Sequence, residues 1–542
     1  MPLPSEAASD FVEAWSERDV ESMISQFDAR SRRRWPEKRL RRLFREAFRA
    51  GALESLSVTR SDAERVASNN GSALVGYELT YTSHAAGPSV GLRGDLRLSL
   101  QRGSWRVAWN KGLMWPGVQG AAGLDVLLRW PRRAPILDRR GRRLAHGDAA
   151  SRRYPYGTLG GTIVGHLGTA SKGQVREGPY ERGDLAGASG LEGAYEARLA
   201  GAPSARLVVA SRRGEPLKVL GREAGERARP IRSTIDIGVQ RAVAEAYGST
   251  VGGVVVLDPR RGHTLAAVSS SGLDPRSARG ASGLTPFDRA LSGRYPPGSA
   301  MKVVTASAAL ESRVVTPATA VTGPKEYKGV RNFESGQFGS IDFATAVRFS
   351  VNTAFAQVAE RVGGRRLTRF AERFGFNRAP AMELPAATSS FPPPADLYDL
   401  MWGSIGQAQV LATPLEMASV AATIANGGRR MEPRATFMDP KRRERVVAGK
   451  TAATMGRLMQ DVVNGGTGEG AQVPGVAVAG KTGTAEVDVD GRRRNHAWFI
   501  CFAPAGAPKV AVAVVAELGG VGGEVAAPLA GAILQRVLPL VP

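Results

Sequence analysis

Cysteine and histidine are scarce in this 542-residue chain, and their scarcity excludes several kinds of site. The single cysteine, Cys501, permits neither an intrachain disulfide nor a zinc cluster built from thiolates. The five histidines lie far apart and show no HxxxH or HExxH spacing, the pattern of zinc-dependent hydrolases. We therefore expect no metal site in this protein.

Long apolar runs are also missing. No stretch of 18 or more apolar residues occurs, so the sequence predicts no membrane-spanning helix. The first 30 residues contain no apolar core of a signal peptide. Taken by themselves, these observations predict a cytosolic protein.

Acidic residues are outnumbered, with 50 Asp and Glu against 73 Lys and Arg, so the formal net charge is +23. This charge favours a polyanionic neighbour such as nucleic acid, anionic lipid or an anionic wall polymer. Only 11 of the cations are lysines, a skew typical of the codon usage of GC-rich genomes. A basic nucleic-acid-binding protein stays an alternative, although no recognised binding motif accompanies the charge.

The first part of the chain, residues 1–116, combines helical and strand-like patterns. Apolar residues recur at helical spacing from Phe11 to Phe27 and within the basic stretch 38–49. That basic stretch is interpreted as an amphipathic helix with a solvated face, with an anionic-surface role as the alternative. Alternating patterns then predict antiparallel strands, at residues 74–83, 92–101 and 104–110. Helices followed by a strand meander predict a small α+β domain.

The middle part, residues 117–228, is rich in glycine and arginine and predicts an irregular, mostly β connecting module. The third part, residues 229–542, has two early and three late strand-like runs, separated by about 200 mostly helical residues. Together they predict one five-stranded antiparallel sheet, on which a helix over residues 524–538 can pack. The five runs are residues 253–257, 264–269, 476–487, 496–503 and 510–518.

The first motif with chemical meaning is Ser299-Ala-Met-Lys302, after the turn-forming Tyr-Pro-Pro-Gly. A serine at a helix start lies among free backbone N–H groups, which favour developing negative charge. Lys302, one turn later on the same face, can reach the Ser299 hydroxyl and act as a base if burial lowers its pKa. A helix-capping serine followed by an exposed lysine is the alternative, because one Ser-x-x-Lys is expected by chance.

The second motif is Ser350-Val-Asn352, at the junction of two helical patterns. A hydroxyl and an amide two residues apart can both point into a cleft, where the serine relays a proton and the amide holds a peptide carbonyl. A helix cap is the alternative, and the commoner one for such a pair taken alone.

The third motif is Lys481-Thr482-Gly483-Thr484, inside an apolar strand. Glycine in a strand commonly permits the close approach of a ligand or another backbone. Thr482 and Thr484 share a face and, with Lys481, could bind a carboxylate. The alternative is a solvent-facing edge strand with a bulge.

The order Ser-x-x-Lys, Ser-x-Asn, Lys-Thr-Gly resembles that of the penicillin-recognising acyl-serine enzymes. Further segments extend the resemblance to class B penicillin-binding proteins over almost the whole chain. The pedestal, or dimerisation, module is represented by segments 133–145, 153–155, 165–168 and 187–192, and the transpeptidase domain by 233–240, 404–407 and 412–418. Phe11, Trp15, Trp109 and Trp115 are similar to positions of the nuclear-transport-factor-like N-terminal domain of the low-affinity, methicillin-resistance type.

The resemblance implies a multidomain α+β protein. Its expected parts are a small α+β N-terminal domain (1–116), a β-rich pedestal module (117–228) and a transpeptidase domain (229–542) in which helices flank the five-stranded antiparallel sheet. The implied activity is that of a D,D-transpeptidase, which cross-links peptidoglycan stem peptides and is covalently inhibited by β-lactams. The family needs neither cofactor nor metal, and it has no nucleic-acid partner. A membrane glycosyltransferase of the cell-wall machinery is an implied protein partner.

Residue roles follow from the matching positions. Ser299 is the implied nucleophile, Lys302 its base and Ser350 the proton relay to the leaving amine. Asn352 holds the substrate amide, and the backbone N–H groups of Ser299 and Thr484 form the oxyanion hole. The terminal carboxylate is implied to bind within the third motif, which comprises Lys481, Thr482, Gly483 and Thr484.

The family works on the extracytoplasmic face of the cell membrane and carries an N-terminal anchor, which this sequence lacks. The motifs imply an extracytoplasmic enzyme, whereas the absence of an apolar run predicts a cytosolic protein. We give the motifs more weight and expect either a truncated form or a misassigned start. A β-lactamase and a β-lactam sensor remain the enzymatic alternatives. A β-lactamase would need a deacylating base, and no Glu-x-x-x-Asn loop is found.

Overall fold

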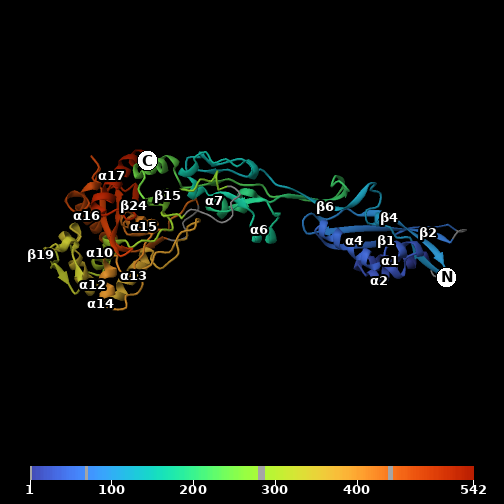
Figure 1. Ribbon diagram of the computed structural model, residues 1–542, viewed down its shortest axis with the longest axis horizontal. Coiled ribbons are helices and arrows are strands. Elements are labelled where there is room, and N and C mark those ends of the chain that lie inside the picture. The colour runs from blue at the N-terminus through green and yellow to red at the C-terminus, as the bar shows by residue number, and fades with distance from the viewer. Residues whose placement is uncertain (1–2, 68–70, 279–286, 438–442) are drawn as a thin grey trace. The chain divides into compact units, whose positions relative to one another are not determined.

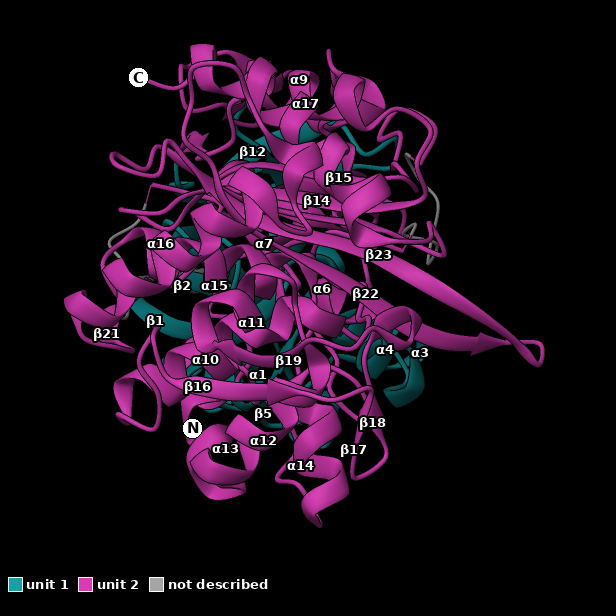
Figure 2. Cartoon of the chain, turned by 90° about the vertical axis from the view of Figure 1, so that its left-hand side faces the viewer, with its two compact units in different colours: residues 1–132, 200–228 teal, residues 133–199, 229–542 magenta. Residues whose placement is uncertain are grey.

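The computed structural model (Figure 1) describes residues 3–67, 71–278, 287–437 and 443–542. Two compact units, coloured separately in Figure 2, make up the chain. The N-terminal unit comprises residues 1–132 and 200–228, and the C-terminal unit comprises residues 133–199 and 229–542. The predicted middle part contributes to both units, so the division into three parts stays a prediction.

The N-terminal unit begins with helices and continues as an antiparallel sheet of order β1-β2-β4-β5, with β3 beside β2. The buried residues of the first helix, Ala8, Phe11, Val12 and Trp15, follow helical spacing, which explains why this face packs into the core. The helices are α1 (Pro4–Glu17), α2 (Val20–Ser25), α3 (Ala29–Arg34) and α4 (Glu37–Ala50). The strands are β1 (Leu53–Ala67), β2 (Ser72–Ser83), β3 (Gly87–Pro88), β4 (Leu92–Gln101) and β5 (Ser104–Val107).

Three of these strands lie where the alternating patterns predict them, whereas β1 and the two-residue β3 were not predicted. Charged and polar residues fill most of β1, and only Leu53, Leu56 and Val58 of its first residues are buried. A strand that is largely exposed lacks the apolar alternation on which the prediction depends.

A second antiparallel sheet of this unit has the order β12-β11-β6. It is formed by β6 (Ala121–Arg129), β11 (Ser204–Ser211) and β12 (Pro216–Glu223).

The C-terminal unit opens with short elements, in which helices occur beside the predicted strands. The strands are β7 (Ile136–Leu137), β8 (Arg143–Ala145), β9 (Leu167–Thr169), β10 (Leu185–Gly187) and β13 (Ile231–Arg232). The helices are α5 (Gly161–Val164), α6 (Lys172–Glu177), α7 (Gly190–Ala194) and α8 (Glu196–Ala200). A buried ionic cluster lies among them, in which Glu192 accepts hydrogen bonds from Arg133 and Arg152, each at 2.6 Å.

The centre of this unit is the predicted five-stranded antiparallel sheet, with the order β15-β14-β24-β23-β22. Two of the three inner strands, β14 and β24, are buried throughout, as expected for strands covered on both faces. Figure 2 shows α9 and α17 above the sheet and α10 and α15 below it. The strands are β14 (Gly252–Asp258), β15 (His263–Ser269), β22 (Ala479–Val489), β23 (Arg492–Ala503) and β24 (Val510–Ala516).

Most of the remaining chain is helical. The helices are α9 (Ile237–Tyr247), α10 (Lys302–Glu311), α11 (Phe343–Arg348), α12 (Asn352–Val362), α13 (Gly364–Phe374), α14 (Leu397–Ser404), α15 (Pro414–Ala425), α16 (Gly449–Gly465) and α17 (Ala527–Val537). Three strand pairs accompany them: β16 (Ala320–Gly323) with β19 (Gly339–Asp342), β17 (Glu326–Tyr327) with β18 (Val330–Arg331), and β20 (Arg429–Met431) with β21 (Arg443–Arg445). Within the described ranges, no helix has both the length and the hydropathy that crossing a bilayer requires.

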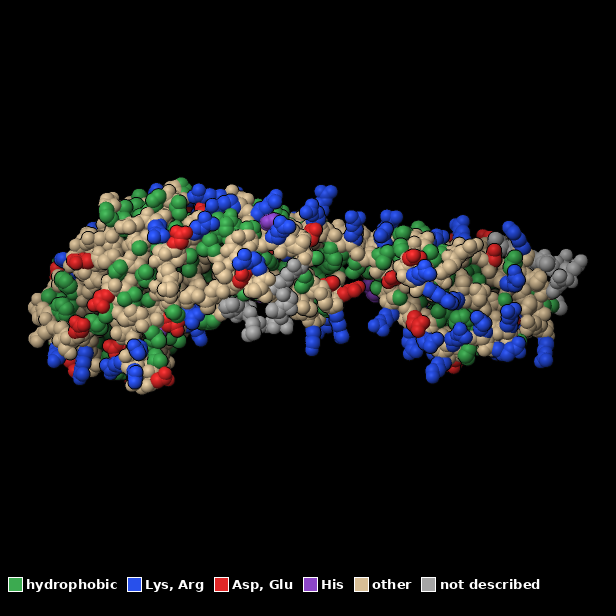
Figure 3. Space-filling model, turned by 45° about the horizontal axis from the view of Figure 1, so that its top comes forward, with side chains coloured by type: hydrophobic (Ala, Val, Ile, Leu, Met, Phe, Trp, Pro, Cys, Tyr) green, Lys and Arg blue, Asp and Glu red, His purple; other side chains and the backbone are tan. Residues whose placement is uncertain are grey.

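The excess of positive charge is not gathered at one place on the face drawn in Figure 3, where Lys and Arg side chains are scattered over both units. The predicted amphipathic helix in the basic stretch is α4, which buries Leu40, Phe44 and Ala47 and leaves its cations exposed. The structure of α4 therefore agrees with the interpretation of an amphipathic helix with a solvated basic face.

Candidate active site

Ser299 lies in a 3₁₀ turn, η4 (Gly298–Met301), that leads directly into α10. The turn packs against β22, because a Cβ added at Gly298 would lie 2.4 Å from the carbonyl oxygen of Thr484. A Cβ added at Gly483 would in turn lie 2.5 Å from the carbonyl oxygen of Pro297. Two glycines, one from each motif, therefore allow the serine turn and the Lys-Thr-Gly strand to meet.

Lys302 is buried and makes its hydrogen bonds with the second motif. Its Nζ donates to the Ser350 carbonyl oxygen at 2.7 Å, to Ser350 Oγ at 3.0 Å and to Asn352 Oδ1 at 2.6 Å. Burial, and secondarily the charge of Lys481, hold the pKa of Lys302 well below its usual range. An amine that loses its proton this readily can serve as a base near neutral pH.

The hydroxyl of Ser299 makes no hydrogen bond among the residues that the structure describes. The expected hydrogen bond between Lys302 and Ser299 is therefore not formed among the described residues, and Lys302 Nζ is hydrogen-bonded to Ser350 and Asn352 instead. Catalytic hydrogen bonds are often long in a free enzyme and tighten only when substrate binds. The exposed-lysine alternative is wrong, since Lys302 is 1% exposed.

Ser350 connects the first motif to the third. Its Oγ accepts from Lys302 Nζ at 3.0 Å and from Lys481 Nζ at 2.9 Å. Its backbone has φ +57°, a left-handed conformation that costs a non-glycine residue about 1–3 kcal/mol and is frequent at functional sites. The helix-cap alternative is wrong, because the N-cap of α12 is Val351, and the side chain that accepts from its first turn is that of Asn332, at 3.0 Å from the Thr353 nitrogen.

Asn352 is the first residue of α12 and faces the same lysine. Its Oδ1 accepts from Lys302, and its Nδ2 donates to the carbonyl oxygen of Arg331 at 2.9 Å. The amide is therefore held by two partners in a fixed orientation.

Lys481 has no exposed surface, although β22 is the edge strand of the sheet. Burial lowers its pKa to about 7. Its Nζ also donates to the Thr482 carbonyl oxygen at 3.1 Å and reaches Thr482 Oγ1 at 3.4 Å. The alternative of a bulged, solvent-facing strand is wrong, because β22 pairs with β23 in an unbroken register.

The hydroxyls of the third motif have partners of their own. Thr484 Oγ1 accepts from the backbone N–H of Gly522 at 3.1 Å, and Thr482 Oγ1 lies 2.6 Å from Thr467 Oγ1. Sequence reasoning missed Thr467. The only local signal is the sequence Gly465-Gly-Thr-Gly468 at the end of α16, a glycine-rich pattern typical of an ordinary turn.

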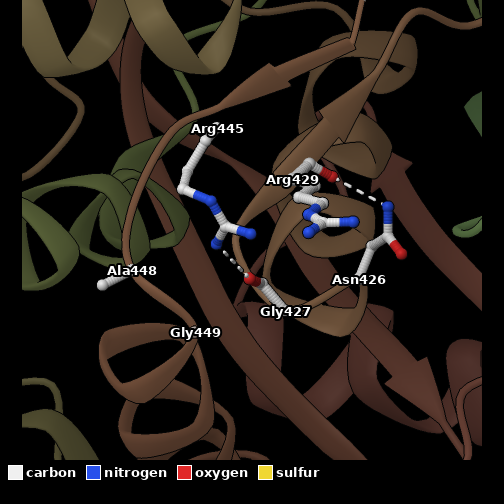
Figure 4. Close-up of a pocket in the computed structure, with 6 residues that line it drawn as sticks. All are labelled: Asn426, Gly427, Arg429, Arg445, Ala448 and Gly449. Carbon is white, nitrogen blue, oxygen red and sulfur yellow. Dashed lines mark hydrogen bonds between the residues drawn. The ribbon is translucent and has the colours of Figure 1, made fainter.

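A separate hollow of about 620 Å³ lies where the end of α15, the β20–β21 pair and the start of α16 meet (Figure 4). Two exposed arginines are among its lining residues, and one of them, Arg445, donates to the carbonyl oxygen of Gly427 at 3.4 Å. The lining residues are Asn426, Gly427, Arg429, Arg445, Ala448 and Gly449. None of the motif residues lines this hollow, so it is not part of the candidate active site.

The penicillin binding protein transpeptidase domain matches residues 252–535, a segment that contains all three motifs. The chain belongs to the penicillin-binding protein transpeptidase family. Two further domain families match this penicillin-binding protein: the penicillin-binding protein dimerisation domain over residues 147–232 and the NTF2-like N-terminal transpeptidase domain over residues 3–121. The predicted resemblance to class B penicillin-binding proteins is confirmed.

Curated relatives of this penicillin-binding protein include the peptidoglycan D,D-transpeptidase PbpA of Mycobacterium tuberculosis. It is 36% identical over 355 residues, which are 56% of this chain and 72% of the relative. The peptidoglycan D,D-transpeptidase MrdA of Acinetobacter baumannii is 29% identical over 432 residues, which are 69% of this chain and 64% of the relative.

Solved structures of penicillin-binding proteins are also similar to this chain. Penicillin-binding protein A of M. tuberculosis, in a ceftriaxone acyl-enzyme complex, has 31% identity and a TM-score of 0.62, covering 75% of this chain and 98% of its own. Pseudomonas aeruginosa PBP2, in complex with WCK 5153, has 27% identity and a TM-score of 0.66, covering 76% of this chain and 96% of its own. The predicted multidomain α+β fold with a C-terminal transpeptidase domain is confirmed.

Proposed function

We propose that this penicillin-binding protein is a peptidoglycan D,D-transpeptidase that works through an acyl-enzyme on Ser299 and is covalently inhibited by β-lactams. The observation that carries the proposal is the Ser350 hydroxyl, which accepts hydrogen bonds from two buried lysines that belong to different motifs. The printed names of the relatives, peptidoglycan D,D-transpeptidases, support the same activity.

In the first half of the reaction, Ser299 Oγ attacks the carbonyl carbon of the D-Ala-D-Ala peptide bond. Lys302 takes the hydroxyl proton, which its lowered pKa permits. Ser350 contacts Lys302 and is placed to pass a proton on to the leaving D-Ala amine. The C–O bond of the acyl-enzyme forms, and the C–N bond breaks.

In the second half, the amine of another stem peptide attacks the ester carbonyl. The C–N cross-link forms and the bond to Ser299 breaks, and the proton that the amine loses passes through the Lys302–Ser350 pair to the serine oxygen. The same two residues therefore act as base and acid in turn, as microscopic reversibility requires.

Negative charge on the substrate is held by backbone and side-chain groups. The N–H groups of Ser299 and Thr484 form the oxyanion hole, and β22, as an edge strand, leaves one row of backbone groups unpaired within the sheet. Lys481, Thr482 and Thr484 bind the terminal carboxylate, and Asn352 holds the substrate amide. No step in this scheme requires a metal or a cofactor.

The proposed place of work is the extracytoplasmic face of the bacterial membrane, where peptidoglycan is cross-linked. A membrane glycosyltransferase that supplies glycan strands is the proposed protein partner, because cross-linking consumes the polymer that such an enzyme makes.

The test is release of D-Ala from a stem pentapeptide, followed by transfer to an added amine acceptor. We expect both with the wild-type chain and neither with Ser299→Ala. A chain that is acylated by penicillin yet never releases D-Ala would be a β-lactam sensor. Rapid turnover of a chromogenic cephalosporin would identify a β-lactamase instead.

A further inference from the structure

A threonine outside the three motifs contacts the strand that carries Lys481. Thr467 Oγ1 lies 2.6 Å from Thr482 Oγ1, and Lys481 Nζ lies 3.4 Å from the same Thr482 oxygen. We propose that Thr467 is a positioning residue that donates a hydrogen bond to Thr482 Oγ1. Thr482 then accepts in this contact, and its own hydroxyl proton stays available for a hydrogen bond to the carboxylate of a ligand. The inference rests on the proposed function, because it assigns a ligand carboxylate to Thr482.

The argument counts protons and lone pairs. A threonine hydroxyl has one proton and two lone pairs, whereas an ammonium group only donates and a carboxylate only accepts. Lys481 therefore approaches a lone pair of Thr482. A carboxylate takes the Thr482 proton, because hydrogen bonds to an ionised acceptor are the stronger ones. Thr482 must then accept in its contact with Thr467, and Thr467 is the donor.

Thr484 provides an internal comparison, because the direction of its hydrogen bond is certain. The backbone N–H of Gly522 donates to Thr484 Oγ1 at 3.1 Å, so the proton of Thr484 is free for another acceptor. Both hydroxyls of the proposed carboxylate site thus accept from a neighbour. For Thr484 that neighbour is the main chain, and for Thr482 it is a side chain that a substitution can remove.

The position of Thr467 is fixed by the segment that leads to Ser350. The Thr467 N–H donates to the Arg348 carbonyl oxygen at 3.3 Å, and Arg348 Nε donates to the Gly465 carbonyl oxygen at 2.8 Å. Thr467 is therefore bonded through its backbone to the segment just before the second motif and through its hydroxyl to the third motif. Within the described residues, its hydroxyl makes no other hydrogen bond, so its proton has no competing acceptor.

The experiment compares two ligands that differ only at the carboxyl group, benzylpenicillin and its methyl ester. Second-order rate constants for acylation of Ser299 are measured by intact mass, and the acid-to-ester ratio reports how much the carboxylate contributes. In Thr467→Val we expect this ratio to fall about 3- to 10-fold, which corresponds to the net contribution of one neutral hydrogen bond. The ester rate should be unchanged. Thr467→Ser, which keeps the hydroxyl, should restore the wild-type ratio.

Two further variants make the result specific. Thr368→Val removes a buried hydroxyl that has no hydrogen-bond partner among the described residues, and it should keep the wild-type ratio. Thr467→Ala removes the hydroxyl without adding a methyl group, and it replaces the valine variant if that one does not fold.

An unchanged ratio in Thr467→Val or Thr467→Ala overturns the inference. So does an equal fall of the acid and ester rates, because that pattern indicates a purely structural role. In both cases the wild type is still acylated at Ser299, so the proposed function survives. A wild type that no penicillin acylates overturns the proposed function, and the inference falls with it.

Discussion

Lys302 and Lys481 donate to one and the same acceptor, at 3.0 and 2.9 Å from Ser350 Oγ. Both lysines are buried, and burial lowers the pKa of each, with the charge of Lys481 lowering that of Lys302 further. Two ammonium groups this close together in a buried site repel each other, so loss of one proton is favoured. Lys302 begins α10, directly after the turn that carries Ser299, and this position makes it the base of the pair.

Acylation at Ser299 is the first prediction. Penicillin G should add one adduct to the intact mass of the wild-type chain, and peptide mapping should place the adduct on the peptide that contains Ser299. Ser299→Ala should gain no mass, because it lacks the nucleophile. An adduct on any other peptide would show that the nucleophile is misassigned.

Loss of the base should slow acylation strongly. We expect Lys302→Ala to reduce the acylation rate about 10²- to 10⁴-fold, the usual contribution of general base catalysis. Lys450→Ala, at an exposed lysine in the first turn of α16, is the matched control and should acylate at the wild-type rate. Stopped-flow measurement with a fluorescent penicillin gives both rates. Equal rates for the wild type and Lys302→Ala would eliminate Lys302 as the base.

The pH dependence of acylation should be bell-shaped. Lys302 acts when neutral, so the rate rises as the pH passes its lowered pKa. Lys481 acts when charged, so the rate falls again as the pH rises through its pKa of about 7. In Lys481→Arg the alkaline limb should disappear, because arginine keeps its charge over the whole range, although the altered shape lowers the maximum. An alkaline limb that persists in this variant would show that another group causes it.

Gly298 should not tolerate a side chain. Its φ is +52°, and an added Cβ would lie 2.4 Å from the Thr484 carbonyl oxygen, so Gly298→Ala must move the serine turn away from β22. We expect a loss of about 1–3 kcal/mol in the free energy of unfolding and a large loss of acylation. Gly506→Ala is the control, because no atom of the described residues, apart from its two chain neighbours, lies within 4 Å of its added Cβ. Thermal unfolding and penicillin labelling of the two variants provide the comparison.

The acyl-enzyme formed with a β-lactam should persist. Deacylation by water needs a positioned base, and Ser350 is already shared by two lysines. The opened drug also stays attached and blocks the approach of the amine that the transpeptidation step would use. After acylation and removal of free drug by gel filtration, the adduct mass should remain for many minutes. Its loss within a second would favour the β-lactamase alternative.

Much of the fold and the motif chemistry was predictable from local sequence. The runs that became β14 and β24 are continuously apolar because both faces of these strands are buried, and such strands are conspicuous in a sequence. The three motifs were identifiable because their order along the chain is informative even without coordinates. The strand β1 was missed because its side chains are mostly polar and exposed, which leaves no alternating pattern.

Only the tertiary structure decided which groups meet. Sequence spacing predicted that Lys302 contacts Ser299, three residues away, whereas its hydrogen bonds are with Ser350 and Asn352, 48 and 50 residues away. Thr467 and Thr482 are 15 residues apart, one in the turn after α16 and the other in β22, so no periodicity connects them. Local sequence determines helices, strands and turns because their hydrogen bonds and spacing are short-range. The partners, the burial and hence the lowered pKa values of the two lysines depend on the packing of α10, α12 and β22, which forms only when distant segments fold together.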